Sequence, residues 1–105
     1  MRTLDFNMRF KDFRGTETGG RTIAEEMAMA LFNAGIPELP VDREDKFTAY
    51  KISTKLIANS GVIELSEQDI TFLRTFSCIA FSAGACGQIL DLLEEERNGT
   101  NRSYT

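Results

Sequence analysis

The sequence predicts an α+β fold that is mostly helical, with an N-terminal β-strand, three to four helices and a short second strand near residues 62–65. Apolar and polar residues alternate over residues 3–13, which is the period of a strand with one buried face. Capping motifs at residues 22–25 and 66–69 mark two helix starts. A chain of 105 residues with 42% hydrophobic content suits one compact domain. We expect that domain to span residues 1–97 and residues 98–105 to form a flexible tail.

The N-terminal strand has Leu4, Phe6, Met8 and Phe10 on one side and polar residues on the other. It is expected to end at Gly15, after which GTETGG forms a loop. Residues 62–65 offer one short partner, so the strand should leave an edge that a helix covers or that pairs with another copy.

The first helix is predicted over residues 23–34. Thr22 and Glu25 fit a capping box at its start, and Gly35 suits the position just after its end. Residues 36–41 hold both prolines and form a connector.

A second helix should begin after Asp42, with acidic residues in its first turn, and end at residues 59–61. It has two adjacent apolar stripes, of which one is Phe47, Tyr50, Thr54 and Ile57 and the other is Ala49, Ile52 and Leu56. Alternation over residues 50–56 also fits a strand, but the acidic start and the later lysines favour a helix.

Residues 67–96, which follow Ser66, are helical, either as one long helix or as two joined near residues 82–87. The expected buried seam is Ile70, Leu73, Phe76, Ile79, Ala83, Cys86, Ile89 or Leu90, and Leu93. Further apolar residues lie on other sides, so the segment must be wrapped by its own domain or by another subunit. This predicts a homo-oligomer, with interface candidates Phe6, Met8, Phe10, Phe72, Phe76 and Phe81.

Composition argues against several functions. The chain has no histidine, which removes serine–histidine and cysteine–histidine catalysis and histidine-ligated metals. A net charge of −4 argues against general nucleic-acid binding. Residues 75–90 are uncharged but too short and polar to span a membrane, and no signal-peptide run begins the chain, so we expect a cytoplasmic protein. No enzymatic activity, cofactor or metal is predicted.

The two cysteines, Cys78 and Cys86, are expected to be small buried hydrophobes. On one continuous helix they would be about 12 Å apart, which is too far for a disulfide. Without histidine they cannot form a structural zinc site within one chain.

Residues 15–22, GTETGGRT, follow the spacing of a phosphate-binding loop, with Arg21 in place of the usual lysine. The arginine, the alternating strand and the short chain argue against nucleotide hydrolysis. A strand-to-helix turn is the simpler interpretation. The alternative function is a small-ligand binder that holds an anionic or nucleotide-like molecule at Gly19, Gly20, Arg21 and Thr22, at a subunit interface or within one chain.

The order of segments also carries a resemblance. The relevant parts are residues 4–10, Gly15, residues 50–56, ELSEQD at 64–69 and GQIL at 87–90. This layout resembles small acidic accessory proteins of phage and prophage gene clusters. The resemblance implies a non-enzymatic role, either inhibition or sequestration of a host component or help in virion assembly. The leading hypothesis is therefore an oligomeric binding protein that acts by contact with a protein partner.

Overall fold

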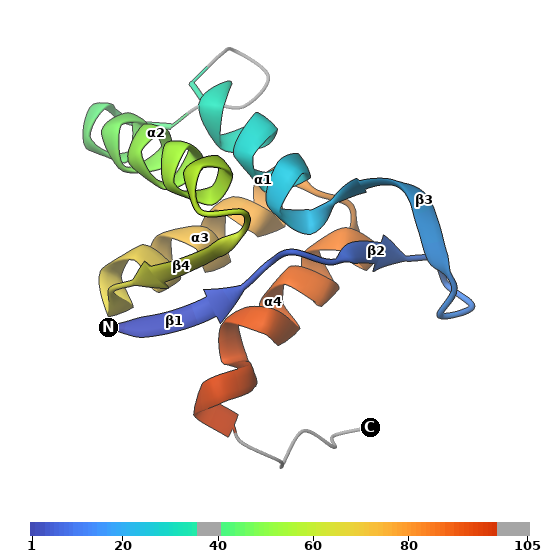
Figure 1. Ribbon diagram of the computed structural model, residues 1–105. Coiled ribbons are helices and arrows are strands. Elements are labelled where there is room, and N and C mark those ends of the chain that lie inside the picture. The colour runs from blue at the N-terminus through green and yellow to red at the C-terminus, as the bar shows by residue number, and fades with distance from the viewer. Residues whose placement is uncertain (36–40, 99–105) are drawn as a thin grey trace.

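The computed structural model describes residues 1–35 and 41–98, with side-chain surroundings through residue 94. These residues form an α+β fold that is mostly helical, as the sequence predicts (Figure 1). The elements in chain order are β1 (Arg2–Asp5), β2 (Arg9–Lys11), β3 (Glu17–Thr22), α1 (Ile23–Phe32), α2 (Arg43–Ala58), β4 (Val62–Leu65), α3 (Glu67–Ala80) and α4 (Ala83–Asn98). Of the predicted connector, residues 36–40 lie outside the described residues, as does the predicted tail after Asn98.

The strand predicted over residues 3–13 is wrong as a continuous element. β1 pairs antiparallel with β4, where Leu4 lies opposite Ile63, and this confirms the short strand at residues 62–65. The chain then leaves the ladder at Phe6, which buries its side chain completely. Pairing resumes only in β2, so Met8 lies between two separate sheets and is partly exposed.

The loop predicted for GTETGG is also corrected. Residues 17–22 form β3, which pairs antiparallel with β2 in a hairpin that projects from the rest of the fold (Figure 1). The Asp12 carboxylate accepts hydrogen bonds from the backbone N–H groups of Arg14 and Thr16, and Gly15 takes a positive φ of 84°. This tight turn brings a glycine-containing segment of low strand propensity alongside β2.

Helices α1 and α2 begin where their caps predict. The Thr22 hydroxyl accepts from the Glu25 N–H, and the Asp42 carboxylate accepts from the Asp45 N–H. The two helices pack side by side (Figure 1). Residues 43–58 are helical, so the competing strand interpretation of residues 50–56 is wrong.

Residues 67–96 form two helices, because Phe81 takes an extended conformation and ends α3. Most of the predicted seam is buried, but Ile79 is 57% exposed and Ala83 is also exposed. Both lie beside the break, where the two helices point in different directions. The break also overturns the expected separation of the cysteines: the Sγ atoms of Cys78 and Cys86 are 3.4 Å apart.

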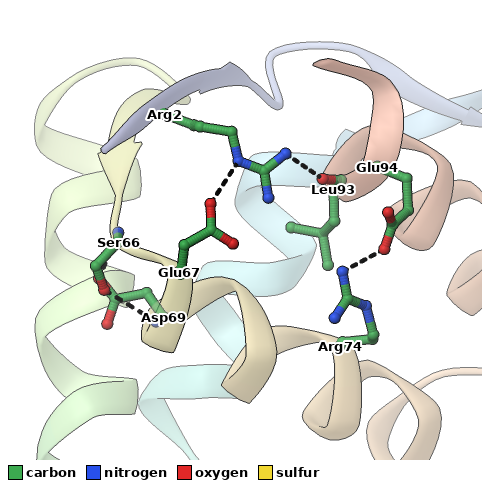
Figure 2. Close-up of polar contacts among 7 residues, drawn as sticks. All are labelled: Arg2, Ser66, Glu67, Asp69, Arg74, Leu93 and Glu94. Carbon is green, nitrogen blue, oxygen red and sulfur yellow. Dashed lines mark hydrogen bonds and ion pairs between the residues drawn. The ribbon is translucent and has the colours of Figure 1, made fainter. Parts of the chain in front are cut away.

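A group of polar contacts joins β1 to the two C-terminal helices (Figure 2). The Arg2 side chain is largely buried, with its Nε atom 3.2 Å from a Glu67 carboxylate oxygen. One of its terminal nitrogens donates to the Leu93 carbonyl oxygen in α4 at 3.2 Å. Arg74 of α3 pairs with Glu94 of α4 nearby. Because a buried guanidinium needs partners on several sides, these contacts set how α3 and α4 approach β1.

Gly61 should be intolerant of any side chain. Its φ is 88°, and a Cβ there would lie 3.0 Å from the Asn7 backbone nitrogen and 3.1 Å from Ala24 Cβ. We expect Gly61→Ala to lower the free energy of unfolding by about 2 kcal/mol, since backbone strain and a close contact add. Urea denaturation measures the change.

Gly19→Ala is the matched control, because Gly19 lies in an extended strand and a Cβ there would meet no atom within 4 Å beyond its two chain neighbours. It should change the free energy of unfolding by no more than about 0.5 kcal/mol. Equal effects of the two substitutions would contradict the role assigned to Gly61.

Candidate functional site

Five large apolar side chains are exposed on α1 and α2. They are Met29 and Phe32 on α1 and Phe47, Tyr50 and Ile57 on α2, and between 45% and 65% of each is exposed. We call this set the α1–α2 apolar face. Single exposed apolar residues are ordinary, whereas a contiguous group often marks a contact surface.

The members of the α1–α2 apolar face are contiguous. The rings of Phe32 and Tyr50 have centroids 6.3 Å apart, and those of Phe47 and Tyr50 are 6.4 Å apart and nearly parallel. At the other end, Met29, Phe32 and Ile57 line a groove of about 310 Å³ between the helices, with Ala28 and Ser53 also in its lining. The face is therefore a continuous surface that includes an apolar depression.

The pattern of side-chain size explains why this face points outward. On α2 the buried side consists of Ala49, Ile52, Ser53 and Leu56, and the stripe with Phe47, Tyr50 and Ile57 lies outside. Small residues such as Ala28 and Ser53 fit between two packed helices, where a phenylalanine would not. Of the two stripes in the sequence, the one with aromatic residues is thus left in solvent.

Lysines border the face. The Lys51 ammonium lies 4.9 Å from the centroid of the Phe47 ring, a cation–π contact. The Lys46 side chain passes over Gly35, just beyond the end of α1. Lys55 is also exposed, and after Asp45 the rest of α2 has no acidic residue. The surroundings on the α2 side are therefore positive, although the whole chain carries a net charge of −4.

A second hollow, of about 480 Å³, lies between the start of α2 and α3. Phe72, Phe76 and Ile79 supply part of its apolar lining, and Asp42 and Asp45 also line it. The Asp42 carboxylate is already engaged as the cap of α2, and Gln68, Thr71 and Thr75 supply further polar groups to the lining.

The structure separates the six predicted interface residues. Phe6 and Phe76 are buried in the core of the single chain and cannot contact a partner without repacking, so these two assignments are corrected. Phe10 and Phe81 are half-buried against each other, with ring centroids 6.3 Å apart. Phe72 lines the α2–α3 hollow, and Met8 lines a groove near β2. The six predicted interface residues therefore do not form one surface.

The predicted anion-binding residues do lie together, but in a geometry that favours other contacts. Gly19 and Gly20 are in the extended strand β3 and do not form the concave nest of a phosphate loop. Thr22 caps α1, and its own N–H donates to the Glu25 carboxylate. Arg21 lies 3.8 Å from the Glu26 carboxylate. Carboxylates of the chain itself therefore occupy the place where a bound anion would lie.

Sequence reasoning missed the α1–α2 apolar face. A usable signal was present, because α2 has more apolar positions than one buried stripe requires. Periodicity alone does not say which of two adjacent stripes faces the core.

The chain was compared with protein-family models, curated proteins and solved structures, and none of them matches it. Within the described residues, no three histidine, cysteine, aspartate or glutamate side chains are grouped to hold a metal ion. No helix in the described part of the chain is long and apolar enough to cross a membrane.

Removing two rings from the face should leave the fold intact. We expect the double substitution Phe32→Ser and Phe47→Ser to change the free energy of unfolding by less than about 1 kcal/mol, because both side chains are already mostly in water. Leu56→Ala, which empties a fully buried position on the same helix, should cost about 2–5 kcal/mol. Chemical denaturation compares the two, and a reversed order would contradict the assignment of the α2 faces.

Proposed function

We propose that the protein is a non-enzymatic binding protein and that its contact surface is the α1–α2 apolar face. The main support for this proposal is that five large apolar side chains are exposed and form one contiguous surface on two packed helices. Burying such a face against a partner removes apolar area from water, which is the main favourable contribution to protein association.

The charge beside the α1–α2 apolar face indicates which class of partner it fits. Lys46, Lys51 and Lys55 lie along the α2 side of an apolar centre, so the complementary surface is apolar with carboxylates along that side. The groove between α1 and α2 has the form that receives side chains of an amphipathic helix. The proposed partner is therefore a protein that presents an acidic amphipathic helix.

The resemblance to phage and prophage accessory proteins supports the same class of function. Such a protein would act by inhibiting or sequestering a host component, or by assisting virion assembly. A second copy of this chain is the competing occupant of the face, which would make the protein a homo-oligomer.

The test uses two designed helical peptides that share an apolar face and differ only in flanking residues, glutamate in one and lysine in the other. We expect the wild-type protein to bind the glutamate peptide, with an affinity that falls as salt is added. Phe32→Ser should weaken binding by about tenfold or more, because it removes a central aromatic anchor. Isothermal titration calorimetry gives each dissociation constant.

Phe13→Ser is the matched control, since Phe13 is 93% exposed near the hairpin turn and distant in sequence from the face. It should bind the glutamate peptide as the wild type does. Equal binding of both peptides, or an unchanged affinity of Phe32→Ser, would contradict the proposal. So would a dimer seen by light scattering at micromolar concentration that Phe32→Ser dissociates, because a second copy would then occupy the face.

A further inference from the structure

The corner between α3 and α4 brings both cysteines into contact. Cys78 lies in the last turn of α3 and Cys86 in the first turn of α4, and only Phe81 and Ser82 link the two helices. The Phe81 N–H donates to the Ser77 carbonyl oxygen at 3.1 Å, and the Cys86 N–H donates to the Ser82 carbonyl oxygen at 2.7 Å. These bonds define the corner, so the fold itself holds the two thiols together.

The two thiols are close and differ in access. Their Sγ atoms are 3.4 Å apart, so a disulfide of about 2.05 Å requires them to approach by roughly 1.4 Å. Cys78 is exposed to solvent, whereas Cys86 is buried. Burial, followed by the neighbouring Cys78 thiol, raises the pKa of Cys86, so Cys78 is the thiol that meets a reagent first.

We propose that Cys78 and Cys86 form a redox site that reacts with low-molecular-weight disulfides such as oxidised glutathione and closes into an intramolecular disulfide. The proposal does not depend on the α1–α2 apolar face, because neither cysteine belongs to it.

The reaction proceeds by two exchanges. The Cys78 thiolate attacks one sulfur of oxidised glutathione, which forms a Cys78–glutathione mixed disulfide and releases one glutathione thiolate. Cys86 then loses its proton and attacks Cys78 Sγ, which forms the Cys78–Cys86 bond and releases the second glutathione. In total, two protein thiols and one glutathione disulfide become one protein disulfide and two glutathione thiols, so electrons and protons balance.

Closure would restrain the corner on which the hairpin rests. Phe81, inside the closed loop, packs on Phe10 of β2. Gln88 lies two positions after Cys86 in α4. Its side chain accepts a hydrogen bond from the Lys11 N–H at 2.8 Å and donates one to the Lys11 carbonyl oxygen at 2.9 Å. The disulfide therefore couples the redox state to the segment that holds β2.

The test measures how strongly the native fold favours the disulfide. The reduced protein is equilibrated with mixtures of reduced and oxidised glutathione, once in native buffer and once in denaturant, and the oxidised fraction is determined by alkylation and mass spectrometry. We expect the equilibrium constant in the native state to exceed that of the unfolded chain by about tenfold or more. By thermodynamic linkage, oxidation should increase the folding equilibrium constant by the same factor, which urea denaturation of both forms checks.

Two single variants test the separate roles of the thiols. Cys86→Ala should accumulate the mixed disulfide at Cys78, whereas Cys78→Ala should remain largely unmodified under native conditions. Equal equilibrium constants for native and unfolded chains, oxidation only to disulfide-linked dimers, or equal modification of the two variants would each overturn the proposal. If either alanine variant fails to fold, the comparison of native and unfolded wild-type protein still decides.

Discussion

The position of Phe6 is the constraint on which the other elements depend. Its ring is fully buried, and both of its backbone groups are engaged outside any sheet. Its N–H donates to the Gly61 carbonyl oxygen at 2.8 Å, and its carbonyl oxygen accepts from the Ala24 N–H at 3.0 Å. One residue thus joins the end of β1 to the start of α1 and to the turn between α2 and β4. Buried backbone groups must be paired, so moving any of these segments alone would leave a polar group without a partner.

This junction also explains the division into two small sheets. The chain turns at residues 6–8, where the Met8 N–H donates to the Phe6 carbonyl oxygen and the Met8 carbonyl oxygen accepts from the Ile23 N–H. β1 is thereby directed toward β4, and β2 toward β3, with which it forms the projecting hairpin (Figure 1). A strand of uniform direction could not serve both partners. The helices α1 and α2 then cover the core with aliphatic and small side chains inward, which leaves their aromatic side chains outside.

Local signals in the sequence were reliable where one side chain is sufficient to set the structure. The caps at Thr22, Asp42 and Ser66 all form, because each hydroxyl or carboxylate needs only a backbone N–H three residues away. The short strand at residues 62–65 is likewise confirmed. The prediction of one continuous N-terminal strand failed because it required knowledge of a distant partner. Alternation over residues 3–13 is a strand pattern, but whether pairing continues past Phe6 depends on Gly61, which is more than fifty residues away in the chain.

The same distinction applies to the candidate sites. The sequence by itself determined the mostly helical α+β class, the starts of α1, α2 and α3, and the chemistry excluded by the absence of histidine, because these follow from residue type and short spacing. Tertiary structure decided which stripe of α2 faces solvent, since that depends on what α1 presents to it. It also decided that Cys78 and Cys86 meet, because their separation depends on the break at Phe81, and a pattern that is apolar on several sides fits one long helix as well as two.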